Sequence, residues 1–263
     1  MTGLVERQRE HFNSIAGRYR AARAGGNHVV LKELIWSEFL RDKLQLRQPG
    51  MRVLDAMCGY ADANGMLRRQ LGVDFAYSGF DYSDDVVARV RRDDPDLDVW
   101  QADATGFRAD RRYDLVVLIG GLHHVHHAAA RTLSNLASAI RPGGHFLSFE
   151  PTHGNPVSGA IRDAVYRRNP LFDAETEHDF AVGELMAMFE RAGLVNVDVF
   201  YPGLVAYILY YNPDAFPKLN VGGPRAVRRL FSVERPFLRS VMARALSFAT
   251  MSLWRKPDRE EAR

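Results

Sequence analysis

The sequence predicts a doubly wound α/β fold with a mostly parallel seven-stranded sheet, preceded by helices and interrupted near its end by a helical insertion. Between residues 50 and 200, short apolar runs alternate with longer amphipathic stretches. Helices placed between consecutive strands imply crossover connections and parallel pairing. Several apolar runs also end on an acid or a glycine, and ligands collect at such strand ends in an open parallel sheet.

The composition is that of one main globular domain with appendages. The chain has 263 residues, of which 46% are hydrophobic and 25% charged, and these are average values for folded proteins. A single cysteine, Cys58, excludes an internal disulfide. The N-terminus carries charges of both signs, and no segment has the apolar run of a transmembrane helix. We therefore expect a cytoplasmic protein.

Two helices are expected before the sheet. Across residues 5–46, apolar side chains recur three and four positions apart, which is the period of an amphipathic helix. Gly25, Gly26 and Asn27 divide this stretch into two.

The sheet is expected to begin after Pro49 and Gly50. The predicted strands are residues 52–56, 75–81, 98–102, 113–119 and 145–150. Helices are predicted between them at residues 63–70, 84–92 and 128–140. The last of these should end at Arg141-Pro142-Gly143-Gly144, because proline and glycine cannot continue a helix.

The remainder is expected to hold two more helices and two more strands. The helices run from beyond Pro151 to about residue 168 and over 182–192, and the strands over 195–201 and 249–256. This organisation divides the chain into helices at 1–48, an α/β core at 49–202, and an insertion with the final strand at 203–263. That last part carries eleven Lys or Arg against five Asp or Glu, and a basic region of this kind faces phosphate, a membrane or most commonly water.

Four consecutive strand ends carry candidate ligand contacts. The first loop, VLDAMCGYADANG, has Asp55 followed by the small residues Gly59 and Ala61, which let the backbone approach a ligand. Asp81 ends the second strand, where an acid can bind both hydroxyls of a ribose. Asp103 follows the third strand in QADATGF, and the fourth ends in LVVLIGGLHHV. A single aspartate at a strand end is more often a helix cap than a ligand contact. The evidence for a ligand site is therefore the occurrence of all four loops in order on consecutive strands.

The series VLDAMCGYA, GFDYS, ADAT, YDLVVLIGGLHHV and RPGGHFLSFEP resembles the motifs of class I S-adenosylmethionine-dependent methyltransferases. The resemblance covers about Val53 to Pro151, and HFNSIAGRYR is similar to the lid helix of small-molecule members. It implies a Rossmann-like fold that binds S-adenosylmethionine and releases S-adenosylhomocysteine. The cofactor-binding residues that it implies are Tyr19, Asp55, Met57, Gly59, Asp81, Tyr82, Asp103, Ala104, Ile119 and Gly120.

The glycine loop departs from the family pattern at two positions. Met57 and Ala61 stand where the family has glycine. A nicotinamide dehydrogenase is the weaker interpretation of this loop, because it requires three spaced glycines and only Gly59 is present. Met57 also keeps open a methyltransferase fold diverted to another reaction such as cyclisation. A non-catalytic cofactor-binding partner is the other alternative, and the presence of Asp55, Asp81 and Asp103 together argues against it.

The candidate catalytic residues follow the fourth and fifth strands. His123 and His124 are placed where a base would take a proton from the attacking group, although LHHV is also a structural element in the family. Glu150 is the third candidate, with His153 beside it. His126 and His127 extend the cluster without spaced partners, so we expect no metal site. Cys58 is taken as a small structural residue.

The expected acceptor is a small molecule, with a hydroxyl preferred over an amine or a carbon. Gly120-Gly121-Leu122-His123 replaces the Asn-Pro-Pro-Tyr type motif of amino-group methyltransferases acting on nucleic-acid bases, so a nucleic-acid partner is not expected. EPTHGNP and the stretch after it are similar to enzymes of bacterial sugar, polysaccharide and secondary-metabolite pathways.

The insertion is expected to contribute a wall of the acceptor pocket. Its aromatic residues either line an apolar cavity or pack the insertion onto the sheet; they are Tyr201, Tyr207, Tyr210, Tyr211 and Phe216. The Arg-rich amphipathic stretch at 225–231 is either a solvated helix face or a peripheral contact with a membrane. A monomer and a homodimer both remain open.

Overall fold

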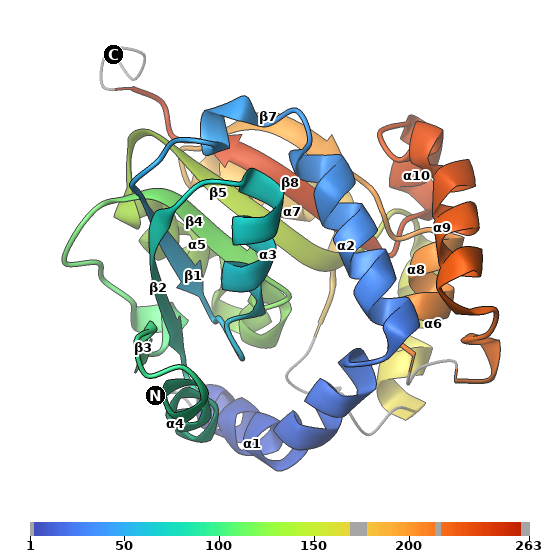
Figure 1. The fold of residues 1–263 in the computed structure, drawn as a ribbon, viewed down its shortest axis with the longest axis horizontal. Helices are drawn as coiled ribbons and strands as arrows, with labels where there is room; N and C mark the ends of the chain where they lie inside the picture. The colour runs from blue at the N-terminus through green and yellow to red at the C-terminus, as the bar shows by residue number, and fades with distance from the viewer. Residues whose placement is uncertain (1–2, 169–177, 214–216, 259–263) are drawn as a thin grey trace.

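A computed structural model describes residues 3–168, 178–213 and 217–258 as one sheet with helices on both faces (Figure 1). The strand order along the sheet is β3-β2-β1-β4-β5-β8-β7, and the short β6 pairs with β5 off this path. Strands β1 to β5 are parallel, whereas β8 runs antiparallel between β5 and β7. This arrangement confirms the predicted Rossmann-like, mostly parallel fold.

The elements alternate along the chain as predicted. The strands are β1 (Met51–Ala56), β2 (Phe75–Asp81), β3 (Asp98–Gln101), β4 (Tyr113–Ile119), β5 (Ile140–His153), β6 (Phe180–Ala181), β7 (Val195–Phe200) and β8 (Ala249–Arg255). The helices are α1 (Gly3–Arg23), α2 (Gly26–Leu40), α3 (Asp62–Leu71), α4 (Asp84–Asp93), α5 (Ala129–Ala139), α6 (Pro156–Arg168), α7 (Val182–Arg191), α8 (Val205–Tyr210), α9 (Gly223–Glu234) and α10 (Val241–Leu246).

One expected turn is part of a strand instead. The segment Arg141-Pro142-Gly143-Gly144 lies inside β5, which starts directly after α5. Gly143 adopts a φ of 71° there, and its N–H donates to the carbonyl of Lys256 at 3.0 Å, while the N–H of Lys256 donates to the carbonyl of Gly144 at 2.9 Å. Backbone pairing with the end of β8 therefore extends the strand through residues that would otherwise form a loop.

The second helix is shorter than expected. It ends at Leu40, and a 3₁₀ turn (Leu44–Leu46) follows. Between the two, Lys43 turns inward, and its Nζ lies 2.9 Å from Oδ2 of Asp198 on β7. Periodicity alone did not reveal this departure, because Leu44 and Leu46 continue the apolar pattern past the helix end.

The sheet is buried on both faces, and neighbouring strand residues alternate between two apolar layers. Val53, Leu115 and Leu147 face the layer that contains α2, α3 and α4, whereas Leu54 and Val116 face the layer that contains α5 and α7. All five side chains are fully buried. This alternation is the period of two that a β-strand imposes, and it leaves the strand ends as the place where a ligand can approach.

The insertion before β8 covers α2 and the end of β5. Helix α9 lies beside α2 (Figure 1) and buries Val227 and Phe231. On its outer side Arg225, Arg228 and Arg229 are exposed, which is the solvated face of an amphipathic helix. Among the residues described, no helix combines the length and the apolar character that crossing a membrane requires.

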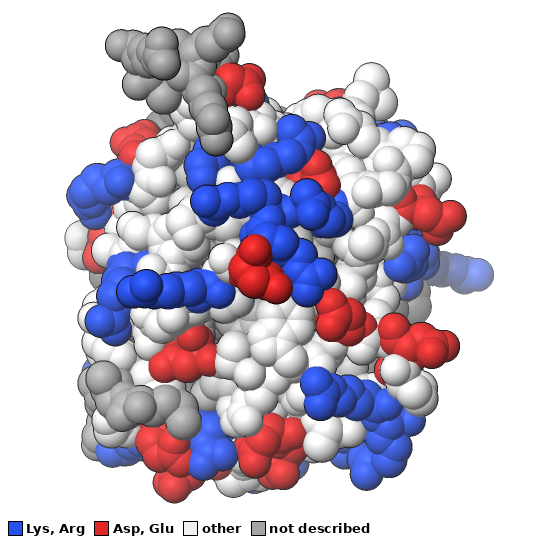
Figure 2. All heavy atoms as spheres, turned by 90° about the vertical axis from the view of Figure 1, so that its left-hand side faces the viewer, with Lys and Arg blue, Asp and Glu red and all other residues white. Residues whose placement is uncertain are grey.

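Charges of both signs share the face on which the edge of the sheet lies. Figure 2 shows Lys and Arg side chains gathered toward the upper half of this face, with acidic side chains beside and below them. Ion pairs of this kind join Arg111 to Asp110 and Arg141 to Asp114 in the protein. Balanced pairs of this kind favour solubility rather than a single-sign binding surface.

Close packing at the end of β5 predicts that Gly154 cannot be replaced. A Cβ at Gly154 would lie 2.0 Å from the carbonyl oxygen of Arg244 and 2.4 Å from that of Ala245. We expect Gly154→Ala to lower the free energy of unfolding by at least about 2 kcal/mol, because backbone atoms must move. Gly183→Ala in α7, where a Cβ meets no atom within 4 Å, is the control and should be neutral or stabilising by up to about 1 kcal/mol. Urea unfolding measures both, and equal effects would contradict this account of the packing.

Candidate active site

A cavity of about 970 Å³ lies between the loops that follow β1, β2 and β4 and the helices α1 and α2. It is lined by eight of the residues predicted from the sequence, namely Asp55, Met57, Gly59, Asp81, Tyr82, Ile119, Gly120 and His124. Part of this volume is open to solvent. We call it the first cavity.

Asp55 lies at the floor of the first cavity and is 2% exposed. The hydroxyl of Tyr77 donates to its Oδ2 at 2.6 Å. Burial raises the pKa of Asp55 to about 7, against the opposing effect of the Tyr77 hydrogen bond. A buried carboxyl of this kind favours a cationic ligand group, which would offset the cost of its negative charge.

Asp81 connects the ends of two neighbouring strands. Its Oδ2 accepts a hydrogen bond from the N–H of Gly59 at 2.9 Å, and its Oδ1 accepts one from the N–H of Ser83 at 3.0 Å. Burial raises the pKa of Asp81 despite these bonds. The carboxylate is thus held rigidly at the cavity wall by the loop after β1.

The loop after β1 keeps the backbone of a glycine loop without two of the glycines. Met57 and Ala61 have φ angles of 54° and 58°, in the left-handed region that favours glycine. Gly121 supplies the room for the Met57 side chain, because a Cβ at Gly121 would lie 3.0 Å from both Cβ and Sδ of Met57. The departure from the family pattern therefore changes a side chain and leaves the path of the loop intact.

A smaller cavity of about 280 Å³ adjoins the first and contains Asp103 and Ala104. Met57, Tyr82 and His124 line both cavities. Asp103 accepts hydrogen bonds from the N–H of Thr105 at 2.8 Å and from its hydroxyl at 2.9 Å. The helix-capping role and the position at a cavity wall are thus combined in one residue.

Helix α1 closes the first cavity from one side. The amide nitrogen of Gln8 lies 2.7 Å from Nδ1 of His124, and the hydroxyl of Tyr82 donates to the carbonyl of Gln8 at 3.2 Å. The ring of Phe12 lies 6.2 Å from that of Tyr82. Tyr19 lies in α1, but its side chain is outside the described part of the structure, so its role stays a prediction.

A second cavity of about 540 Å³ opens beside the first. Four residues line both of them, namely Arg23, Ile119, Gly120 and Tyr211. The far walls of the second cavity are formed by His123, Phe149, Glu150, Pro151, Arg162, Tyr207 and Asn212. A ligand in each cavity would meet at Ile119 and Gly120.

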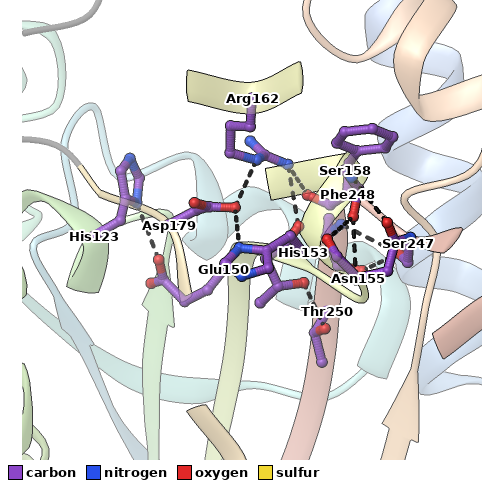
Figure 3. Close-up of polar contacts among 12 residues, drawn as sticks. His123, Glu150, His153, Asn155, Ser158, Arg162, Asp179, Ser247, Phe248 and Thr250 are labelled. Atoms are coloured by element: carbon purple, nitrogen blue, oxygen red, sulfur yellow. Dashed lines mark hydrogen bonds and ion pairs between the residues drawn. The ribbon is translucent and has the colours of Figure 1, made fainter. Parts of the chain in front are cut away.

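Glu150 holds the loop after β4 in place. Its Oε1 accepts hydrogen bonds from the N–H groups of Gly121 and Leu122, both at 3.0 Å, and its Oε2 lies 3.1 Å from Nδ1 of His123 (Figure 3). The side chain of Glu150 is fully buried, and burial raises its pKa to about 7. The structure therefore makes Glu150 a positioning residue for His123, and whether the predicted trio His123, His124 and Glu150 serves catalysis stays a prediction.

Three polar wall residues from α1 and α2 were not expected from the sequence. Arg23, His28 and Lys32 line the first cavity. His28 donates from Nδ1 to the carbonyl of Tyr211 at 2.6 Å, and burial lowers the pKa of His28 to about 4, so it is neutral. The Nζ of Lys32 lies 3.0 Å from Oδ2 of Asp62. Arg23 and Lys32 could hold an anionic part of the ligand, but only the folded arrangement brings them to the cavity.

The other candidate residues lie partly at the second cavity and partly away from it. Tyr207 and Tyr211 line the second cavity, whereas Tyr201 and Tyr210 are buried in the core; Phe216 lies outside the described residues. His153 pairs with Asp179 at 3.0 Å. His126 packs against the rings of His178 and Phe180, as a structural histidine does.

Comparison with known proteins identifies the fold. A family model described as a methyltransferase domain matches residues 31–199. The demethylmenaquinone methyltransferase of Bacillus mycoides (strain KBAB4) is 25% identical over 192 residues, which cover 64% of this chain and 81% of that protein. A candidate sarcosine dimethylglycine methyltransferase from Galdieria sulphuraria has a TM-score of 0.60 and 15% identity, covering 85% of each chain. The [4+2]-cyclase SpnF has a TM-score of 0.55 and 16% identity, covering 84% of this chain and 81% of its own.

The burial of Glu150 predicts a dependence of stability on pH. Because the folded-state pKa is raised to about 7, the stabilisation present at acidic pH is lost as the pH rises through that value. Glu150→Gln keeps acceptors and donors at this place without a charge. In the wild type, the free energy of unfolding should fall between pH 5 and pH 8. We expect Glu150→Gln to make this fall smaller by up to about 3 kcal/mol.

Urea unfolding across this pH range measures the effect. Glu190→Gln on the exposed side of α7 is the matched control and should leave the pH profile of the wild type unchanged. A Glu150→Gln profile as steep as that of the wild type would mean that Glu150 is ionised at little cost. Asp55, whose pKa is also raised to about 7, contributes to the remaining slope.

Proposed function

The chain belongs to the methyltransferase-domain family and is a class I S-adenosylmethionine-dependent methyltransferase, and from this premise we propose that it methylates a hydroxyl of a small molecule. The observation that carries the proposal is the meeting of two cavities at Ile119 and Gly120, with His124 at the first and His123 at the second. The pathway we propose is natural-product or sugar and polysaccharide biosynthesis.

The first cavity fits S-adenosylmethionine by the chemistry of its walls. Asp55 suits the ammonium of the amino-acid part, and Asp81 suits the two ribose hydroxyls. Asp103 and Ala104 in the adjoining small cavity suit the adenine and its amine. Arg23 and Lys32 are cations at the wall that suit the carboxylate. The ammonium and the carboxylate of the cofactor thus each have a partner of opposite sign, and the ribose and the adenine each have a hydrogen-bond acceptor.

The transfer is a single displacement that the protein promotes by alignment. The bound cofactor supplies a methyl group on a sulfonium; the acceptor oxygen forms the new C–O bond as the C–S bond breaks. The loop held by Glu150 places both ligands at Ile119 and Gly120, and positioning of this kind lowers much of the barrier. The hydroxyl proton passes to His123, which is the proposed base.

The hydrogen bonding of the two histidines favours His123 over His124 as the base. Nδ1 of His123 faces the Glu150 carboxyl at 3.1 Å, which leaves Nε2 as the nitrogen for the acceptor. Nδ1 of His124 faces the amide of Gln8 in the lid helix, and His124 lines the first cavity. His124 is therefore better placed to close the lid than to meet the acceptor.

Two competing functions have specific support. The relatives named for demethylmenaquinone support a ring compound, and hence a ring carbon, as the second candidate acceptor. Similarity to a [4+2]-cyclase supports a diverted reaction, although at 16% identity it concerns the fold. Calorimetry with S-adenosylmethionine and S-adenosylhomocysteine, followed by an assay for S-adenosylhomocysteine formation with phenols, sugars and polyketides, separates these. Formation of S-adenosylhomocysteine with an acceptor supports transfer; tight binding without it favours the diverted reaction.

Removal of the ribose partner should weaken cofactor binding. We expect Asp81→Ala to raise the Kd for S-adenosylhomocysteine at least tenfold, because charge-assisted hydrogen bonds contribute about 1.5–3 kcal/mol each. Asp85→Ala on the exposed part of α4 is the control and should leave the Kd unchanged. Calorimetry measures both, and an unchanged affinity for Asp81→Ala would show that the ribose binds elsewhere.

The two histidines should differ in their effect on turnover. We expect His123→Ala to lower kcat by about 100-fold or more with the Kd for S-adenosylhomocysteine unchanged, as the loss of a general base does. His124→Ala should mainly weaken cofactor binding by loosening the lid. If neither variant slows turnover, the assignment of the base is wrong.

A further inference from the structure

We propose that the acceptor is a planar ring compound carrying a carboxylate, with its ring against the aromatic wall of the second cavity and its carboxylate at Arg162. This inference rests on the proposed function and names the acceptor class. It follows from three features of the second cavity: the rings that line it, the buried cation in its wall, and the placement of its acidic group.

The aromatic wall consists of Phe149, Tyr207 and Tyr211. The rings of Tyr207 and Tyr211 are stacked at 4.6 Å with an angle of 15° between their planes. Phe149 meets both edge-on, at 5.5 Å from Tyr211 and 6.4 Å from Tyr207. Since Tyr211 also lines the first cavity, a ring packed on this wall lies next to the point of methyl transfer. A flat apolar ring matches such a wall better than a sugar, whose hydroxyls each require a partner.

Arg162 places a fixed positive charge in the same cavity. It lies on α6, is 7% exposed, and lines the second cavity. Its Nη2 donates to the carbonyls of Phe248 and Thr152, the latter at 3.4 Å, and its Nε lies 3.0 Å from Oδ2 of Asp179 (Figure 3). A guanidinium stays charged when buried. These contacts come from β5, from the residue before β8 and from the residue before β6, so they fix the position of the charge.

The charges around Arg162 favour an anion over a cation. Asp179 is shared, because the ring nitrogen Nδ1 of His153 lies 3.0 Å from the same Oδ2 that faces Arg162. Across the cavity Arg23 adds a second cation, whose Nη2 donates to Oδ1 of Asn212 at 3.1 Å. Of the charged side chains described in the wall, the remaining one is Glu150, whose oxygens are enclosed by the loop N–H groups and His123. A carboxylate therefore finds Arg23 and an Arg162 that is already paired with Asp179, whereas a protonated amine finds in Glu150 a carboxyl whose oxygens are already bound.

The second cavity has a volume of about 540 Å³, part of which is open to solvent. Arg162 and the aromatic wall are both part of this volume, and Ile119 and Gly120 mark its border with the first cavity. A hydroxyl at that border and a carboxylate at Arg162 would orient the ring in one direction, which specifies the oxygen that is methylated.

Binding of matched ligands to the enzyme loaded with S-adenosylhomocysteine tests the inference. The probes are 4-hydroxybenzoate, its neutral analogue 4-hydroxybenzamide, and the cationic phenol tyramine. We expect the acid to bind at least tenfold more tightly than the amide, and tyramine to bind most weakly. Equal or tighter binding of the amide, or binding of none of the three at millimolar concentration, overturns the ring-acid class.

Two variants connect the preference to this cavity. Arg162→Gln should bring the acid and the amide to within about threefold of one another, with the affinity for S-adenosylhomocysteine unchanged. Because Arg162→Gln loses buried contacts and can fail to fold, Asn212→Asp provides a second test. It adds a negative charge to the wall beside Arg23, where an ion pair can form, and should lower the preference for the acid at least threefold.

The control is Arg131→Gln on the exposed side of α5, which should keep the preference of the wild type. A folded Arg162→Gln and a folded Asn212→Asp that both retain the full preference overturn the role of this cavity. If S-adenosylhomocysteine binds and the amide is methylated without any preference for the acid, the inference fails and the proposed function stands. If S-adenosylhomocysteine does not bind to the folded protein, both fail.

Discussion

The site depends on buried carboxyl groups at the ends of the parallel strands, each of which holds a loop by accepting its backbone N–H groups. Asp81 at the end of β2 binds the loop after β1 through Gly59, and Glu150 on β5 binds the loop after β4 through Gly121 and Leu122. A buried carboxyl is costly without hydrogen-bond donors, and an unpaired buried N–H is costly without an acceptor. The hydrogen bonds between these carboxyls and N–H groups offset the cost of burying both. They therefore fix the positions of the loops at neighbouring strand ends relative to one another.

The same constraint gives the site its electrostatic character. Asp55, Asp81 and Glu150 are nearly or fully buried, and burial raises the pKa of each. A ligand that brings a positive charge to Asp55 or hydroxyl donors to Asp81 recovers free energy that the empty site lacks. The stability that the fold forgoes by burying these acids therefore becomes binding free energy for a cationic, ribose-bearing cofactor.

Much of the fold and the floor of the site could be predicted from the sequence, because both depend on local patterns. Strand periodicity located β2 and β4 to the residue, and acids at strand ends located Asp55, Asp81 and Asp103. The extension of β5 was missed because it depends on pairing with Lys256, more than a hundred residues away. Arg23, His28 and Lys32 carry no comparable signal, since a cation or histidine on a helix is usually solvated or simply buried. Their place at the cavity follows from how α1 and α2 pack on the sheet.

The junction of α1 and α2 links the first cavity to the second. Three polar contacts join it to the insertion: Arg23 to Asn212 at 3.1 Å, Asn27 to Asn220 at 2.7 Å, and His28 to the carbonyl of Tyr211 at 2.6 Å. Because Tyr211 stacks on Tyr207, the aromatic wall is held from the same junction at which α1 ends. If α1 moves about this junction, the aromatic wall of the second cavity moves with it. Binding in one cavity would then be coupled to the shape of the other without contact between the two ligands.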